Sequence, residues 1–321
     1  MHSRSAAGVG LALLAAVTFA TSGTFARSLI EAGWSAESAV IARVGVAALV
    51  LAIPALLSLR GKWDVLRSNA ATIGLFGLLG VAVAQVCFFN AVRYLPVGVA
   101  LLLEYLGIIL VVVWMWLRHG QPPRRLTIAG SVAALAGLTF VLDLAGTADF
   151  HPVGVLWGLG AAFGLAGYFV LAGRVDPRLP SVAMASGGMA VGAAMLLLVG
   201  LTGLLPLHAT FGEVTFAGQS TSWLVPIAGL SLVAAVIAYL AGIAGTRILG
   251  PRLSSFVGLT EVLFAVLIAW LFLNELPTGW QLFGGALIIA GVALVRLDEL
   301  RGSPSTPAPA TPEPELALDG R

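Results

Sequence analysis

The sequence contains few charged residues and a single cysteine. Only 10% of its 321 residues are charged, against about 25% in an ordinary soluble domain, and 59% are hydrophobic. A water-soluble protein of this length needs more polar groups than these to cover its surface. The composition therefore excludes a soluble globular enzyme, a disordered chain and a nucleic-acid-binding protein. Cys87 alone cannot form an internal disulfide framework or a cysteine-based metal site.

Long apolar runs take the place of polar surface. A helix needs roughly 17 to 25 apolar residues to cross a hydrocarbon core of about 30 Å. Ten stretches meet this requirement: 7–26, 36–59, 70–92, 96–117, 126–144, 152–173, 181–206, 223–246, 253–273 and 279–295. These runs are continuous and about twice as long as the strands of a membrane β-barrel. We therefore predict an all-α integral membrane protein with ten transmembrane helices and a long outer loop over 207–222.

The basic residues indicate how these spans are oriented. Lys and Arg concentrate in the short cytoplasmic loops of membrane proteins. If the N-terminus lies inside, all 17 basic residues except Arg27, Arg93 and Arg43 fall in cytoplasmic segments. We therefore predict a multi-pass protein of the cell inner (plasma) membrane with both termini in the cytoplasm.

The two halves of the chain carry a weak internal repeat. Phe19, Gly23 and Phe25 of the first span recur in the sixth at a constant spacing of 144 residues, and Glu104 in the fourth span corresponds to Glu261 in the ninth. Because five is odd, a second set of five helices starts on the opposite side of the membrane. We predict one five-helix repeat over 1–145, a second, inverted repeat over 146–297, and a disordered cytoplasmic tail, rich in Pro and Ala, over 298–321. Inverted repeats are frequent in secondary transporters, whose substrate sites lie between the repeats.

Several segments resemble one known family. They are PVGVA followed by LLLEYLG around Glu104, GLTEVLFAVLIAWLFLNELP from Gly258 to Pro277, and QLFGGALIIAGVALV after it. With these motifs the chain resembles the EamA-type transporters of the drug/metabolite transporter superfamily, over about residues 8 to 297. The first repeat departs from the family pattern near Gly120-Gln121, which corresponds to Glu275. The resemblance implies export of amino acids, related small metabolites or drugs, without identifying the substrate.

Three ionisable residues lie well inside the predicted spans: Arg43, Glu104 and Glu261. A charge at a helix centre costs from about 2.5 to over 10 kcal/mol, so each is a candidate for function. At about 1.5 Å per residue, Arg43 and Glu104 lie roughly 10 and 12 Å from the same membrane face. We predict that these two residues bind and orient a polar or zwitterionic substrate. Gln85, Tyr105 and Thr21 complete the predicted substrate-binding set.

Glu261 is predicted to have a different role. The repeat places Ser186 where Arg43 would recur, which leaves Glu261 without a cationic partner. A low dielectric favours the protonated form of such a carboxyl group, so Glu261 is predicted to couple protons or to gate transport. The competing interpretation makes Arg43 and Glu104 a structural ion pair and Glu261 a packing residue. Tyr168 and Tyr239 are further polar candidates of lower rank.

These observations favour a secondary transporter that works by alternating access. No catalytic or nucleotide-binding motif is present, so we predict that the protein is not an enzyme and needs no cofactor or metal. Its expected partners are a small-molecule substrate and the lipid bilayer, without nucleic acid, and its expected state is a monomer or homodimer. An integral membrane enzyme and a passive channel or scramblase remain alternative functions.

Overall fold

The structure is a computed structural model that describes residues 2–92, 94–95, 97–120, 122–141, 151–273 and 278–302. Within these ranges nine helices are long and apolar enough to cross a membrane, and Arg125–Val141 is a tenth, shorter apolar helix. The predicted all-α membrane fold with ten transmembrane helices is therefore confirmed. Predicted span 126–144 extends beyond the described residues by three positions.

Several of the ten spans consist of more than one helical segment. The first five spans are α1 (His2–Ala20) with α2 (Ser22–Glu31), α3 (Ala36–Ser58), α4 (Trp63–Leu75) with the π-helix η1 (Phe76–Val83) and α5 (Ala84–Val92), α6 (Val97–Tyr105) with α7 (Gly107–His119), and α8 (Arg125–Val141). The second five are α9 (Pro152–Arg174), α10 (Ser181–Leu201), α11 (Leu224–Ala228) with the π-helix η2 (Gly229–Ile237) and α12 (Ala238–Leu249), α13 (Pro251–Gly258) with α14 (Thr260–Leu273), and α15 (Gly279–Gly302).

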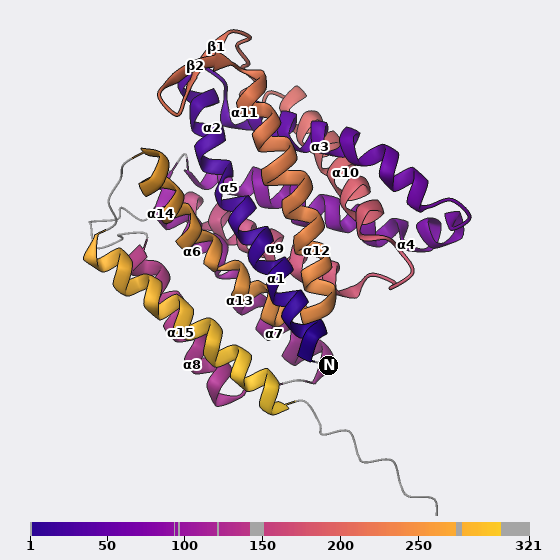
Figure 1. Cartoon of the computed structure of the whole chain (residues 1–321), viewed down its shortest axis with the longest axis vertical. Helices are drawn as coiled ribbons and strands as arrows, with labels where there is room; N and C mark the ends of the chain where they lie inside the picture. The colour runs from indigo at the N-terminus through magenta and orange to yellow at the C-terminus, as the bar shows by residue number, and fades with distance from the viewer. Residues whose placement is uncertain are drawn as a thin grey trace, which may run out of the picture.

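The contacts between spans have the symmetry of two inverted repeats. The first span packs on the eighth through α1 and α12, and the sixth packs on the third through α9, η1 and α5. The first span corresponds to the sixth and the eighth span corresponds to the third, so these two contacts are equivalent when the two halves are exchanged. Three further contacts join equivalent spans: α3 with α10, α7 with α13, and α8 with α15. Each half is therefore completed by the other, and spans far apart in the sequence lie side by side (Figure 1).

The α8–α15 pair shows how glycine permits this packing. A Cβ atom on Gly137 would lie 2.5 Å from the carbonyl oxygen of Gly284, and a Cβ on Gly284 would lie 2.5 Å from the carbonyl oxygen of Gly137. Further along the same two helices, Gly130 and Gly291 contact each other in the same reciprocal way. Small residues allow membrane helices to approach this closely. The two equivalent helices therefore meet backbone to backbone.

Equivalent spans are also interrupted in similar regions. The fourth span breaks at Leu106, directly after Glu104 and Tyr105, and the ninth breaks at Leu259, just before Glu261. The third and eighth spans each contain a π-helix, η1 and η2. Broken helices and π segments often occur at functional positions in membrane proteins. The breaks in the fourth and ninth spans therefore lie beside Glu104 and Glu261.

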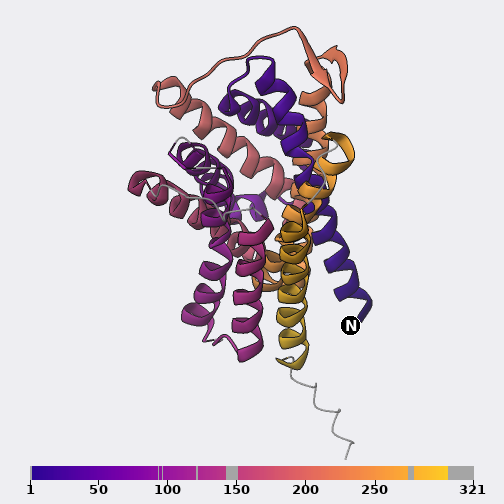
Figure 2. The ribbon, with the colours of Figure 1, turned by 90° about the vertical axis from the view of Figure 1, so that its left-hand side faces the viewer.

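One end of the molecule carries a small hairpin that the sequence does not predict. Strands β1 (Glu213–Phe216) and β2 (Gln219–Ser222) pair antiparallel through a turn at Ala217 and Gly218, which both have positive φ, as tight hairpin turns require. Phe216 stacks on Phe25 of α2 with 5.3 Å between the ring centroids. The hairpin lies at the end of the molecule away from the N-terminus (Figures 1 and 2).

The last helix is longer than the sequence predicts. α15 continues to Gly302, so residues 298–302, assigned to the tail, are helical. Asp298 is buried, and its carboxylate accepts a 2.5 Å hydrogen bond from the hydroxyl of Thr127 on α8. This polar contact extends the α8–α15 pair past its apolar part. Residues 303–321 lie outside the described residues.

Candidate functional site

A cavity of about 320 Å³ lies between the two halves of the chain. It is lined by residues of spans one to four and of spans six, eight and nine, so that neither repeat forms it alone. The volume falls at the lower end of the range for small-molecule sites. Five of the six predicted site residues line this cavity: Arg43, Gln85, Glu104, Tyr105 and Glu261.

Arg43 is held on one wall of the cavity by the other half of the protein. One terminal nitrogen of its guanidinium donates a hydrogen bond to the carbonyl oxygen of Ala234 in η2. The guanidinium also lies 5.6 Å from the ring centroid of Phe19, a cation–π distance. Its Nε atom is buried without a partner among the described residues. The side chain is thus fixed at the cavity edge while part of its donor capacity is unused.

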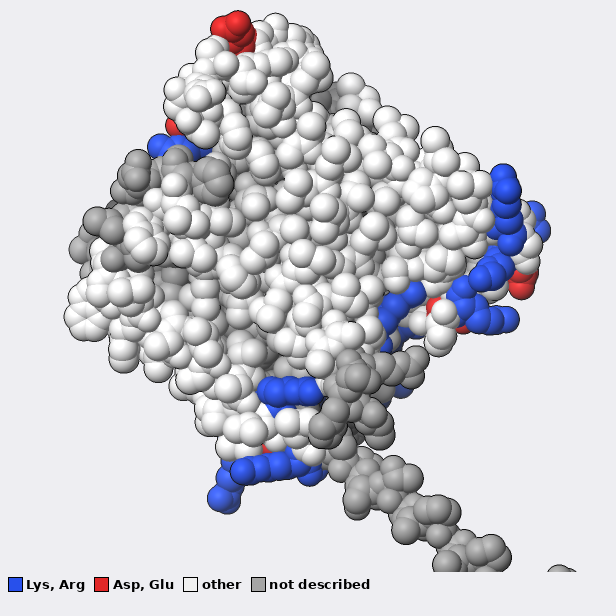
Figure 3. All heavy atoms as spheres, in the orientation of Figure 1, with Lys and Arg blue, Asp and Glu red and all other residues white. Residues whose placement is uncertain are grey.

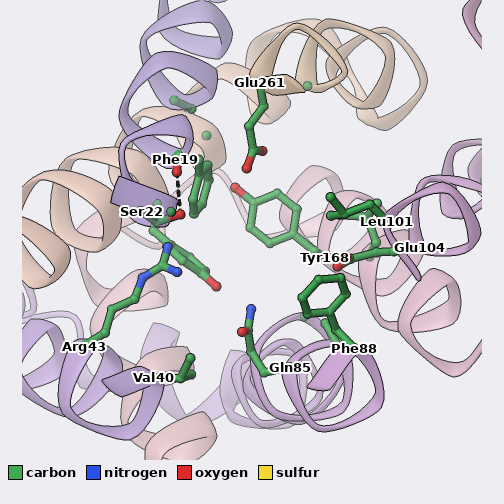
Figure 4. Close-up of a pocket in the computed structure, with 18 of the residues that line it drawn as sticks. Phe19, Ser22, Val40, Arg43, Gln85, Phe88, Leu101, Glu104, Tyr168 and Glu261 are labelled. Carbon is green, nitrogen blue, oxygen red and sulfur yellow. Dashed lines mark hydrogen bonds between the residues drawn. The ribbon is translucent and has the colours of Figure 1, made fainter. Parts of the chain in front are cut away.

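The two glutamates lie away from Arg43. Figure 4 shows Arg43 on one side of the cavity, Glu104 on the other, and Glu261 directed toward the centre. No ion pair or hydrogen bond joins Arg43 to Glu104 among the described side chains, so the structural ion pair considered from the sequence is not formed. The two side chains project from different walls of the cavity (Figure 4). Glu104 and Glu261, the equivalent residues of the two repeats, therefore share one cavity.

The remaining predicted residues differ in their positions. The amide of Gln85 points into the cavity between Arg43 and Glu104 (Figure 4). Tyr105 is buried at the end of α6, where its side chain interacts with that of Glu261. Thr21 is not among the lining residues, because its hydroxyl donates to the carbonyl oxygen of Thr18 at the break between α1 and α2. The neighbouring Ser22 lines the cavity instead.

The sequence prediction named the tyrosines of the lining but missed its phenylalanines. Phe19, Phe88, Phe89 and Phe169 face the cavity together with Tyr168 and Tyr239. A signal for them was present in the first span, because the lining residues Ala12, Ala15, Ala16, Phe19, Ser22, Gly23, Ala26 and Ile30 follow helical spacing. In an apolar span such a stripe cannot be separated from a lipid-facing or packing stripe without the structure.

The cavity lining extends to the hairpin end of the protein, whereas α1 and α12 pack tightly against each other toward the N-terminal end. This lining extends to Ile30 and Ala36 near the hairpin end. Toward the N-terminal end, Gly8 of α1 packs directly on Ile248 and Leu249, where a Cβ would lie 2.7 Å from the Ile248 side chain. Within the described residues no group of three or more His, Cys, Asp or Glu side chains could hold a metal ion.

Arg247 links the helices at this closed end. Its Nη1 donates to the carbonyl oxygen of Leu179 (2.8 Å) and to the hydroxyl of Ser181 (3.1 Å), which joins α12 to the start of α10. We expect Arg247→Ala to weaken this closure, because each hydrogen bond contributes about 1 kcal/mol. The readout is an Ala12→Cys thiol in a Cys87→Ala background. It should react on the order of tenfold faster with an impermeant maleimide added from the N-terminal side.

The matched control is Arg178→Ala, in the same loop between α9 and α10 that contains Leu179. Arg178 is exposed and pairs with Asp176 at 2.9 Å without contacting α12. Labelling of the thiol at position 12 should proceed in this variant at the rate found without either arginine substitution. An equal rise in both variants, or no rise in Arg247→Ala, would show that Arg247 does not hold the closed end.

Comparison with known proteins identifies relatives along the whole membrane region. A family model described as the EamA-like transporter family matches residues 6–143 and 152–297. Protein PecM of Dickeya dadantii (strain 3937) is 25% identical over 264 residues, 78% of this chain and 82% of that protein. Uncharacterized transporter YdfC of Bacillus subtilis (strain 168) is 26% identical over 268 residues, 83% of each chain.

A solved structure shares the fold. One crystal structure of a protein matches 94% of this chain and 99% of its own with a TM-score of 0.73. Its sequence identity of 22% is low, so the likeness concerns the arrangement of the helices. This structural similarity therefore assigns no function to the cavity residues.

Proposed function

The chain belongs to the EamA-like transporter family, and from this premise we propose that it is a secondary transporter that exports amino acids, related small metabolites or drugs by alternating access. Transport across a membrane is the function of the family. The match to the relative YdfC, which is named as a transporter, covers 83% of the length of that protein. The substrate class, the direction and the mechanism are the proposed part.

The observation that carries the proposal is the charged cavity between the repeats. Arg43 and Glu104 come from the first repeat and Glu261 comes from the second, and all three side chains line one space. Ionisable groups inside a bilayer are costly and mark substrate or ion pathways. A site built by both repeats changes its exposure when one repeat moves against the other. The cavity therefore supports a carrier that binds its substrate midway across the membrane.

The closed end supports alternating access. The cavity extends toward the hairpin, while the packing of α1 on α12 and the Arg247 hydrogen bonds close the opposite end. Exchanging the roles of the two repeats, which have symmetric contacts, produces the opposite arrangement: closed near the hairpin and open near the N-terminus. The two arrangements are the conformations that a carrier needs.

The exposed basic residues support the proposed orientation. Lys and Arg side chains gather along the lower and right-hand edges of the face in Figure 3, while the middle of that face is uncharged. Among the described residues, the exposed basic side chains include those of Arg60, Lys62, Arg67, Arg118, Arg124 and Arg125. Placing this end in the cytoplasm of a cell with an inner (plasma) membrane puts both termini inside. The cavity described above then faces outward.

Reconstitution into proteoliposomes tests the function. The purified full-length chain should catalyse counterflow of at least one member of a panel of amino acids and drugs, because a carrier exchanges substrate across the membrane. A channel or scramblase would produce flux without counterflow. A membrane enzyme would convert a compound without moving it. Either result would replace the proposed function by the corresponding alternative.

Glu261→Gln separates the proton role from simple packing. Glutamine keeps the size of the side chain but does not bind or release a proton. We expect the variant to lose any dependence of transport on an imposed pH gradient. Flux measured in the same vesicles with the gradient present and collapsed provides the readout. Gradient dependence that persists in the variant would rule out Glu261 as the coupling residue.

A further inference from the structure

The charges around the cavity do not balance. Among the described residues, the acidic side chains of the lining are those of Glu104 and Glu261, and its basic side chain is that of Arg43. With all three ionised, the lining has a net charge of −1. Uncompensated charge is expensive in a membrane-embedded site. A ligand of net charge +1 neutralises it.

The two carboxylates are available to such a ligand. Neither Glu104 nor Glu261 forms an ion pair with a described side chain, and the guanidinium of Arg43 donates a hydrogen bond to the carbonyl oxygen of Ala234 instead. Both residues line the cavity. Carboxylates accept several hydrogen bonds each, and charged donors such as ammonium groups form the strongest.

An unpartnered hydroxyl beside Glu261 independently points to a ligand. Tyr168 is 6% exposed, and its hydroxyl has no hydrogen-bond partner among the described residues. Figure 4 shows this hydroxyl directed into the cavity toward Glu261. Gly242 packs directly against the same oxygen atom, so the space behind the hydroxyl is closed by α12. A buried hydroxyl without a hydrogen-bond partner is costly. A ligand bound at Glu261 would be close enough to form a hydrogen bond with the Tyr168 hydroxyl.

Arg43 supplies the opposite charge on the other wall. Its Nε is unpartnered among the described residues, and its guanidinium lines the cavity next to Phe19. A guanidinium is well suited to a carboxylate. The cavity thus presents two anionic positions and one cationic position, separated from each other (Figure 4).

From this arrangement we propose that the cavity binds a small molecule with two cationic groups and one carboxylate, the chemistry of a dibasic amino acid. The carboxylate contacts Arg43, and the ammonium groups contact Glu104 and Glu261, with the Tyr168 hydroxyl beside the latter. Opposite charges then face each other at every ionisable position, which is how electrostatic complementarity produces specificity. The proposal narrows the substrate class of the proposed transporter and rests on that function.

A series of lysine analogues tests the charge pattern one group at a time. L-lysine carries all three groups; 6-hydroxynorleucine replaces the side-chain ammonium by a hydroxyl, lysinamide removes the carboxylate, and 2-aminoadipate reverses the side-chain charge. Binding to the full-length protein is measured by calorimetry in detergent. Lysine should bind on the order of tenfold more tightly than each analogue, because each comparison removes a charge-assisted hydrogen bond.

Substitutions locate the interactions. Glu261→Gln or Glu104→Gln should reduce the advantage of lysine over 6-hydroxynorleucine, whereas Arg43→Met should reduce its advantage over lysinamide. Such selective losses identify coupled pairs. Glu31→Gln is the matched control, because Glu31 is exposed on α2 and pairs with Arg27 at 2.8 Å. The analogue series needs no substitution, so it holds even where a variant folds poorly.

The outcomes separate this proposal from the general transport function. Equal affinity for lysine and 6-hydroxynorleucine, tighter binding of 2-aminoadipate, or no lysine binding at millimolar concentration would each overturn the dibasic ligand. If counterflow of a neutral compound occurs in proteoliposomes at the same time, the transporter proposal stands and only the substrate class fails. Absence of counterflow for every compound of the wider panel overturns the transport function itself.

Discussion

Replacing Gly284 with alanine is expected to destabilise the protein by about 1–3 kcal/mol, the usual cost of overpacking. The new Cβ would lie 2.5 Å from the Gly137 carbonyl oxygen and 2.8 Å from the Val141 nitrogen. These are backbone atoms, which cannot rotate away as a side chain does. α15 must therefore move away from α8 along much of its length. Thermal unfolding of the purified protein in detergent measures the loss.

Gly10→Ala is the control for this prediction. No atom lies within 4 Å of the Cβ position at Gly10, so the same substitution in another transmembrane helix meets open space. Its stability should stay near wild type or rise by a fraction of a kcal/mol, because alanine favours a helix over glycine. Gly137→Ala should resemble Gly284→Ala, and the double variant should cost less than the sum, since the helices have already separated. Additive losses would argue against one shared contact.

Arg43→Met is expected to reduce transport at least about tenfold while leaving thermal stability unchanged or raised. Among the described residues Arg43 is the only basic group of the cavity lining, so the variant deprives a substrate carboxylate of its partner. Removing this guanidinium also removes the desolvation cost of a buried charge, which offsets the loss of its hydrogen bond to Ala234. Methionine has a similar length and suits an apolar surrounding. Counterflow and thermal unfolding of the same preparation provide the two readouts.

The comparison of the two readouts decides the role of Arg43. A structural role predicts a fall in stability that parallels the fall in transport. A substrate-binding role predicts that transport falls alone. Arg43→Lys keeps the charge without the planar guanidinium and should retain part of the activity. Arg27→Met, at an exposed arginine on α2, should change neither quantity.

The number of spans and the symmetry of the repeats were predictable because both depend on local hydrophobicity and on the order of the chain. The same reasoning identified Arg43, Glu104 and Glu261, since an ionisable residue inside an apolar run is visible in the sequence. The depth estimate placed Arg43 and Glu104 at one level. It could not place them on one wall, because that depends on the rotation of α3 and α6 about their axes.

Other features depend on tertiary contacts that the sequence does not reveal. Thr21 is a polar residue at the predicted depth, yet its hydroxyl is satisfied by the backbone of its own helix. Ser22, one position later, faces the cavity. The hairpin over β1 and β2 follows from its turn at Ala217 and Gly218, where a two-residue loop reverses the chain. Short polar strands of this kind give little hydrophobic pattern to detect.

The π-helices η1 and η2 have a consequence for how these spans tolerate insertions and deletions. In an α-helix each residue advances the side-chain direction by about 100°, so losing one residue anywhere in α5 would rotate the rest of that helix out of phase. A π segment holds extra residues in its wider turns. The loss of one residue from Phe76–Val83 is therefore absorbed by tightening the segment toward an α-helix. Gln85 and Phe88 would keep their angular positions on the cavity wall, and the same holds for Tyr239 after η2. These two segments are the points in the third and eighth spans at which chain length can vary without changing which side chains face the substrate.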